Sequence, residues 1–216
     1  MADEFQIDVI SDVVCPWCYI GQRRLAEALA NLPEGDAARR AIVRWHPFQL
    51  NPDLPQAGLP RSTYLEDKFG GPERAAQIYA RVSAAGATVG IPFAFDRIAI
   101  QPNTRDAHRL IAWAQALRDA GDLVERMFRA YFIDGRAIGD RDVLAAIAGE
   151  AGFDAVAARH MLDSDEGVDA IALMDQRARE IGVQGVPFFI FNQHIAVSGA
   201  QEPDALLDAI AQARSA

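Results

Sequence analysis

Apolar and polar residues alternate near the start of the chain. The segment Phe5–Ile10 reads FQIDVI, with the period of two that is typical of a half-buried strand. From Cys15 the apolar residues recur instead at helical spacing. They are Ile20, Leu25, Ala28, Leu29 and Leu32. The pattern therefore predicts a strand followed by a helix, and residues 33–35, Pro-Glu-Gly, end that helix.

Residues 42–48, IVRWHPF, predict a second strand. Strand, helix and strand within about fifty residues form a βαβ unit, whose crossover should be right-handed.

Helical patterns dominate residues 61–181. Two expected helices each carry one apolar face, with Leu110, Trp113, Ala114 and Leu117 on the first and Met127, Phe128, Tyr131 and Phe132 on the second. Further helices are expected at 72–85, 140–151, 154–163 and 166–181, and residues 86–102 are interpreted as a looser connection.

Strand patterns return at the end of the chain. Residues 186–191 and 194–197 predict a β-hairpin with a tight turn at Asn192–Gln193, and residues 204–213 predict a last helix. The fold class is therefore α/β, a mixed βαβ…ββα sheet with a large all-helical insertion. We expect one domain from residues 1–60 and 182–216, and the insertion at 61–181.

Composition narrows the possible partners. The formal net charge is −9, which disfavours nucleic acid and anionic membranes as partners. No apolar run is long enough for a membrane span, and Asp3 and Glu4 stand where a secretory signal would carry Lys or Arg. We therefore expect a cytoplasmic protein.

The only two cysteines, Cys15 and Cys18, are three residues apart at the start of the expected helix. Residues at this spacing share a helix face, so their thiols can close and reopen a disulfide. Pro16 fits the first helical turn. The helix N-terminus favours a thiolate at Cys15, which makes Cys15 the expected nucleophile and the deeper Cys18 the resolving thiol.

Two other interpretations of the cysteine pair are weaker. Structural zinc needs four ligands, and His46, His108, His160 and His194 lack ligand spacing, so no metal is expected. Two inert core cysteines would not require a proline inside the pair.

Gly185-Val186-Pro187 directly precedes the late strand. Proline is awkward inside a sheet, and a cis Val186–Pro187 bond would explain it. Such a turn would face the cysteine helix and offer the Val186 backbone to an incoming peptide. The alternative is a trans proline at the start of the strand.

Five segments of the chain together resemble the FrnE-like branch of the DsbA-like thioredoxin superfamily. They are ISDVVCPWCYIGQRRL, WHPFQLNPDLP, PNTRDAHRL, GVPFFIFN and AVSGAQ. The branch is similar in fold to 2-hydroxychromene-2-carboxylate isomerases and kappa-class glutathione transferases. The resemblance implies a thioredoxin fold, a cis Pro187, dithiol–disulfide exchange by Cys15 and Cys18, and an architecture compatible with a homodimer. It implies no tightly bound cofactor, with glutathione as a possible redox partner.

Four further residues are candidates for the site. Trp17 either contacts substrate or packs over the thiols, and Asp12 either tunes them or belongs to a loop. His108, in a helix for which Asn103 is the expected N-cap, is an acid–base candidate or a hydrogen-bonded helix residue. Asn51 belongs to a turn or, by the resemblance, lines a glutathione-sized groove.

Three functions stay open at this point. The favoured one is a thiol–disulfide oxidoreductase acting on disulfide- or dithiol-containing substrates. The second is a glutathione-dependent isomerase or transferase, and the third is an interaction module without activity.

Overall fold

The structure has the expected thioredoxin-like fold with a helical insertion. It is a computed structural model that describes residues 5–215. Asp3 and Glu4, which were the argument against a secretory signal, lie outside the described residues.

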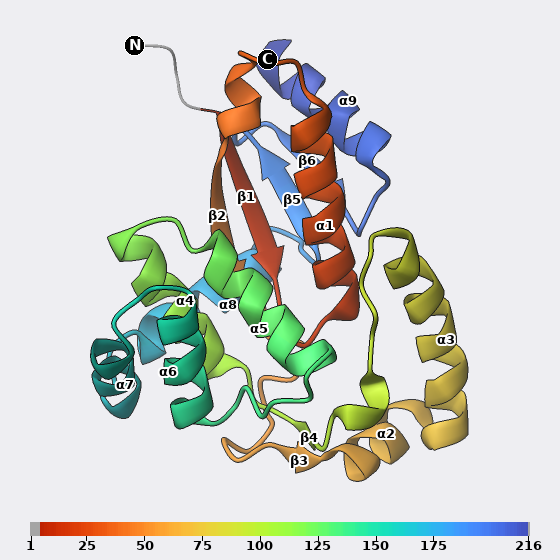
Figure 1. The fold of residues 1–216 in the computed structure, drawn as a ribbon, viewed down its shortest axis with the longest axis vertical. Helices are drawn as coiled ribbons and strands as arrows, with labels where there is room; N and C mark the ends of the chain where they lie inside the picture. The colour runs from red at the N-terminus through yellow and green to blue at the C-terminus, as the bar shows by residue number, and fades with distance from the viewer. Residues whose placement is uncertain (1–4, 216) are drawn as a thin grey trace.

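The centre of the molecule is a four-stranded mixed sheet with the order β2-β1-β5-β6 (Figure 1). Its strands are β1 (Gln6–Ser11), β2 (Ile42–Pro47), β5 (Phe188–Phe191) and β6 (Ile195–Ser198). β2 runs parallel to β1, β5 runs antiparallel to β1, and β6 runs antiparallel to β5. Asn192 and Gln193 have φ of 47° and 62°, which confirms the predicted tight turn.

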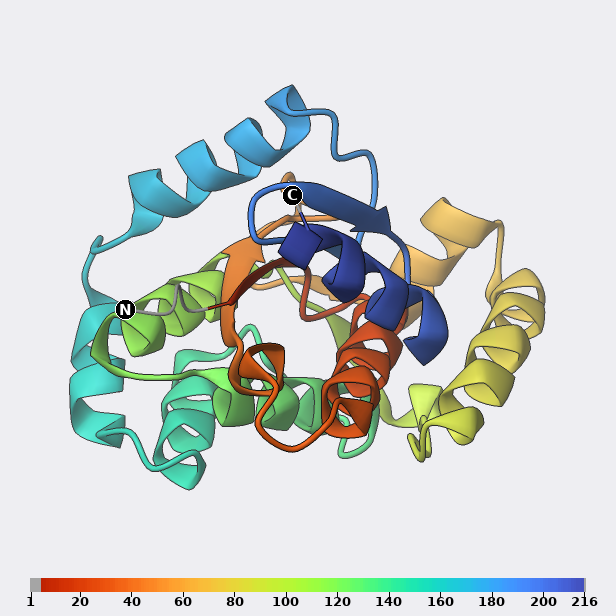
Figure 2. The same ribbon diagram turned by 90° about the horizontal axis from the view of Figure 1, so that it is seen from above.

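The two faces of the sheet carry separate cores because side chains alternate along each strand. Helices α1 (Pro16–Asn31) and α9 (Pro203–Ser215) lie on one face, and α8 (Val168–Glu180) lies across the other (Figures 1 and 2). Val9 and Phe189 belong to the larger core on the side of α1, whereas Ile10 belongs to the smaller core with Ala178 and Val183.

The insertion surrounds the end of the sheet at which β1 stops (Figure 1). Its other helices are α2 (Arg61–Phe69), α3 (Pro72–Thr88), α4 (Arg105–Leu117), α5 (Gly121–Phe132), α6 (Arg141–Glu150) and α7 (Ala155–Asp163). Short 3₁₀ helices occupy Ala37–Arg40 and Phe95–Arg97. The predicted helices therefore exist, with ends shifted by up to three residues. The division into two domains stays a prediction.

Two features of the insertion were not predicted. Helix α2 was missed because its buried residues are Arg61 and Tyr64, so the apolar period is absent. The insertion is also not all-helical, since it contains β4 (Ile100–Gln101), which pairs with β3 (Leu59–Pro60) just before the insertion. A two-residue strand is too short for an alternating pattern.

Helix α4 differs from its sequence pattern at both ends. Its N-cap position is Thr104, not Asn103, although the Asn103 Oδ1 still accepts a hydrogen bond from the Arg105 N–H at 3.0 Å. Leu117 was placed on the apolar face but is 62% exposed, because α4 ends at this residue.

Aromatic packing fixes α1 against the insertion. The Tyr19 ring stacks on Phe128 of α5 with 5.1 Å between centroids, and its hydroxyl donates to the Glu125 carboxylate at 2.8 Å. The residue next to Cys18 is thereby held by the insertion.

Candidate active site

Both cysteines lie where β1 leads into α1, and both carry free thiols. Cys15 is the N-cap residue of α1, with extended backbone angles, and Pro16 starts the helix. The Cys15 N–H donates to the Asp12 carbonyl at 2.9 Å, and the Cys18 N–H donates to the Cys15 carbonyl at 3.0 Å. Cys15 is 5% exposed and Cys18 is 1% exposed, so Cys18 is the deeper thiol, as expected.

The environment of Cys18 keeps it protonated. Burial raises the pKa of its thiol well above the ordinary 9.0, and the adjacent Cys15 thiol raises the pKa further. The Ser11 hydroxyl and the Asp12 backbone favour the thiolate but offset only part of this effect. At neutral pH Cys18 is therefore a thiol that must lose a proton before it can attack.

A loop from the other end of the chain faces Cys15. The Val186–Pro187 peptide bond is cis, as predicted, and the Cys15 Sγ donates to the Val186 carbonyl at 3.5 Å. The Gly199 N–H donates to the Pro187 carbonyl at 2.8 Å, which ties this loop to the end of β6. The two sequence motifs, 171 residues apart, therefore form one site.

The loop below the thiols is held by Asp12, which is fully buried. Its Oδ2 accepts a hydrogen bond from the Leu50 N–H at 2.8 Å, and its Oδ1 lies 3.3 Å from the His108 Nε2. His108, in α4, is itself 4% exposed. The structure thus brings the candidates Asp12 and His108 together, and their contact joins the insertion to the cysteine loop.

Trp17 is exposed, whereas Asn51 is half-buried. The Trp17 side chain is 40% exposed, which agrees with a substrate contact better than with packing over the thiols. The Asn51 carbonyl accepts from the Leu54 N–H in a turn, while its side-chain Oδ1 accepts from the Lys68 Nζ at 3.2 Å. The Asn51 Nδ2 is buried and meets no hydrogen-bond geometry among the described residues, although Asn51 lies close enough to Tyr64 to lower the pKa of its hydroxyl.

A buried arginine and its tyrosines adjoin the site and were missed in the sequence. The Arg61 guanidinium donates to the Tyr131 hydroxyl at 3.3 Å and lies over the Tyr64 ring at 5.3 Å. Burial raises the pKa of Tyr64, the Asn51 side chain and the Arg61 charge lower it, and the charges of Asp12 and Cys15 raise it, so Tyr64 lies within the electrostatic reach of the site. The spacing of Arg61, Tyr64 and Lys68 on one helical face was the available signal.

Within residues 5–215, no three His, Cys, Asp or Glu side chains gather as a metal ion would require. No helix in this part of the chain is long and apolar enough to span a membrane.

The chain matches the model of the DSBA-like thioredoxin domain over residues 6–211. Among solved structures it resembles a probable DsbA oxidoreductase from Streptomyces coelicolor, with 30% identity, coverage of 98% of this chain and 90% of that chain, and a TM-score of 0.86. It shares its fold with a 2-hydroxychromene-2-carboxylate isomerase, at 19% identity, 96% and 95% coverage and a TM-score of 0.69. It also shares its fold with the cytosolic disulfide reductase DsbM from Pseudomonas aeruginosa with GSH, at 20% identity, 97% and 96% coverage and a TM-score of 0.63.

The family model extends across the sheet, the insertion and both parts of the site. The chain therefore belongs to the family of DSBA-like thioredoxin domains.

Proposed function

We propose that this protein is a thiol–disulfide oxidoreductase in which Cys15 is the nucleophile and Cys18 the resolving thiol. The observation that carries the proposal is the position of the Cys15 Sγ, 3.5 Å from the Val186 carbonyl and at the N-terminus of α1. Dipoles at a helix N-terminus favour a thiolate.

The exchange has two steps. The Cys15 thiolate attacks one sulfur of a substrate disulfide, and the other sulfur leaves with the electron pair and takes up a proton. Cys18 then loses its proton and attacks the Cys15 Sγ, which releases the second substrate sulfur as a thiolate. The enzyme is oxidised to the Cys15–Cys18 disulfide, the substrate is reduced to two thiols, and the reverse sequence oxidises a dithiol.

Substrate would dock between Trp17 and the Val186 loop. Trp17 offers an exposed aromatic surface beside Cys15, and the Val186 backbone offers hydrogen-bonding groups to an extended peptide. Pro16 and Pro187 would shape the two sides of this groove. A cytoplasmic location is also part of the proposal, with the cytosolic DsbM as a structural neighbour in its support. A homodimer stays part of the proposal.

Single substitutions of the cysteines test the proposal. In Cys15→Ser, reduction of a disulfide substrate should fall to the uncatalysed rate because the nucleophile is missing. In Cys18→Ser, the first attack should proceed but the mixed disulfide on Cys15 should accumulate, as mass spectrometry of the alkylated protein would show. Full exchange activity in Cys15→Ser would contradict the assignment.

The second candidate is a glutathione-dependent isomerase or transferase. The buried Asn51 Nδ2 favours it, because this donor lies near Lys68 and could bind a carboxylate of glutathione. Calorimetry should then show saturable binding of glutathione that Asn51→Ala weakens, and turnover should survive Cys18→Ser. Absence of binding would exclude this candidate and leave glutathione as a redox partner at most.

A further inference from the structure

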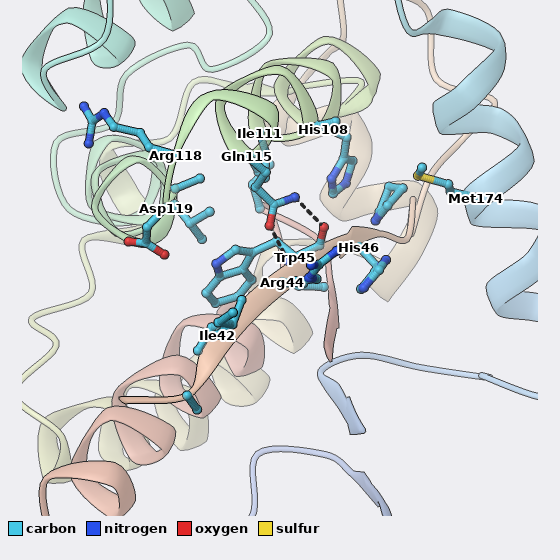
Figure 3. Close-up of a pocket in the computed structure, with 18 residues that line it drawn as sticks. Ile42, Arg44, Trp45, His46, His108, Ile111, Gln115, Arg118, Asp119 and Met174 are labelled. Atoms are coloured by element: carbon cyan, nitrogen blue, oxygen red, sulfur yellow. Dashed lines mark hydrogen bonds between the residues drawn. The ribbon is translucent and has the colours of Figure 1, made fainter. Parts of the chain in front are cut away.

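A cavity of about 620 Å³ lies beside the sheet, between β2, α4 and the start of α5 (Figure 3). β2 is an edge strand of the sheet. The outer rim of the cavity includes the exposed side chains of Arg44 and Asp119, so the cavity opens to solvent. Its inner end includes Ser11, the last residue of β1, and His108.

Two buried polar groups of the cavity wall have no hydrogen-bond partner among the described residues. They are the Ser11 hydroxyl and the Trp45 indole N–H. Ser11 is 5% exposed and Trp45 is 7% exposed. A buried polar group without a partner costs free energy, so each calls for a specific explanation.

Ser11 also lies against Cys18. Its hydroxyl lowers the pKa of the Cys18 thiol, which places it beside this residue, although the hydroxyl has no hydrogen-bond partner among the described residues. Ser11 therefore lies between the resolving thiol, whose pKa it lowers, and the solvent-connected cavity, whose wall it lines.

The other charged or titratable groups near Cys18 are already engaged. Cys15 donates to Val186, and the two carboxylate oxygens of Asp12 face the Leu50 N–H and the His108 Nε2.

Arg44 and Asp119 lie at the exposed rim of the cavity, and two further titratable or charged groups of its wall are engaged. The His46 Nε2 lies 2.7 Å from the Asp8 carboxylate, and the Arg118 guanidinium donates to the Ala151 carbonyl. Ser11 is thus the free hydroxyl between Cys18 and the cavity.

We propose that Ser11 is a positioning residue that carries a proton between Cys18 and solvent in the cavity. The inference rests on the proposed function. As Cys18 attacks the mixed disulfide, the Ser11 oxygen accepts the Cys18 proton and the hydroxyl releases its own proton to water in the cavity. The electron pair of the S–H bond forms the Cys18–Cys15 bond, and the bond between Cys15 and substrate breaks. When Cys18 is released in the reverse reaction, the proton returns by the same path.

The test uses dithiobis(nitrobenzoate), which releases one coloured thiol when Cys15 attacks and a second when Cys18 resolves the mixed disulfide. In Ser11→Ala, the second release should slow about tenfold at neutral pH, because Cys18 loses the hydroxyl that accepts its proton, while the first release keeps its rate. The difference should shrink in strongly alkaline solution, where Cys18 loses its proton directly to hydroxide. Ser11→Thr keeps the hydroxyl and should restore the rate. Ser83→Ala, on α3, is the matched control and should behave as the wild type.

The outcomes separate this inference from the function on which it rests. If the wild type releases both thiols and Ser11→Ala shows the same rates at every pH, the role of Ser11 is wrong. An equal slowing at all pH values, or no rescue by Ser11→Thr, would indicate a packing role and also overturn the inference. If the wild type itself never releases the second thiol, the proposed exchange by Cys18 fails instead.

Discussion

At the scale of single residues, the depth of Cys18 gives the reduced protein a pH-dependent stability. Its pKa is raised by burial in the folded state, so its contribution to stability is full below the ordinary pKa of 9.0 and is lost as the pH rises toward the folded pKa. Above pH 9.0 this one group should lower the free energy of unfolding by about 1.4 kcal/mol per pH unit. Urea unfolding with a reductant at a series of pH values measures the slope. Cys18→Ala should lack this part of the slope, and equal slopes in both proteins would contradict the prediction.

Gly21 is a second residue whose surroundings decide the sign of a substitution. In most helices Gly→Ala stabilises by about 1 kcal/mol. Here a Cβ on Gly21 would lie 2.9 Å from the Pro187 Cγ and 3.1 Å from the Phe189 Cζ, and overpacking of this kind costs about 1–3 kcal/mol. Gly21→Ala should therefore lower the melting temperature and slow disulfide exchange, because it displaces the loop that faces Cys15.

Gly121→Ala is the control for this substitution. Its new Cβ would meet only the end of the Asp119 side chain, at 3.2 Å. Calorimetric melting and the exchange rate should both stay close to wild type in this variant. If Gly21→Ala melts at a higher temperature than the wild type and keeps its disulfide-exchange rate, the prediction is wrong. The Pro187 loop would then move to accept the new Cβ without affecting the site.

The residues of the site differ in how visible they were in the sequence. Cys15, Cys18 and Pro187 stand out because chemistry or backbone geometry restricts their residue types. Asp12 and His108 were visible as candidates, but their contact depends on how α4 packs against the cysteine loop. Arg61 was missed because, in the sequence, an arginine in a short polar helix is expected to be exposed to solvent, whereas this one is buried.

At the scale of elements, the free edge of β2 is closed by one side chain. The Gln115 Oε1 accepts from the Trp45 N–H at 2.6 Å, and its Nε2 donates to the Trp45 carbonyl at 2.9 Å (Figure 3). An amide here imitates a neighbouring strand, and edge strands without such cover promote aggregation.

Gln115→Ala should destabilise the protein by about 1–3 kcal/mol, because it leaves the backbone of Trp45 without partners. Urea unfolding measures this loss, and light scattering on storage should report increased association through β2. Gln115→Met, which keeps the side-chain volume but not the hydrogen bonds, separates the two contributions. If the methionine variant is as stable as wild type, packing and not hydrogen bonding protects the edge.

The elements themselves were predictable where burial is periodic and apolar. Met127, Phe128, Tyr131 and Phe132 are all buried, so the pattern for α5 was correct. Leu117 fits the same kind of pattern in α4 but is exposed. The apolar period shows which face of a helix is buried, but it does not show at which residue the neighbouring elements stop covering that face.

At the scale of the whole molecule, the order of strands and helices predicted the βαβ…ββα mixed sheet, and the resemblance of five segments implied the thioredoxin-like fold. The placement of the insertion over the carboxyl end of β1 was not predictable in detail. It depends on long-range contacts such as the stacking of Tyr19 on Phe128 and the meeting of Asp12 with His108. Each of these contacts joins residues about one hundred positions apart, beyond the reach of a local pattern.

The contact between Asp12 and His108 is therefore a test of how the insertion supports the site. His108→Leu would leave the fully buried Asp12 carboxylate with the Leu50 N–H as its remaining donor among the described side chains and backbone. Breaking a buried polar pair from one side costs about 3 kcal/mol. Because the Asp12 carbonyl also accepts from the Cys15 N–H, the loss should reach the thiols, and the reaction of Cys15 with dithiobis(nitrobenzoate) should change along with stability.

The matched variants are His108→Gln and His194→Leu. The glutamine Nε2 can take the place of the imidazole Nε2, so His108→Gln should recover most of the stability and the Cys15 reaction rate if His108 acts by holding Asp12. His194→Leu removes an exposed histidine and should leave both unchanged. His108→Gln could instead be stable but slow in disulfide exchange, and could lack a bell-shaped pH profile that the wild type shows. The imidazole would then take part in proton transfer, and the positional role would be contradicted. The insertion would then contribute a reacting group to the thiol site rather than a support for it.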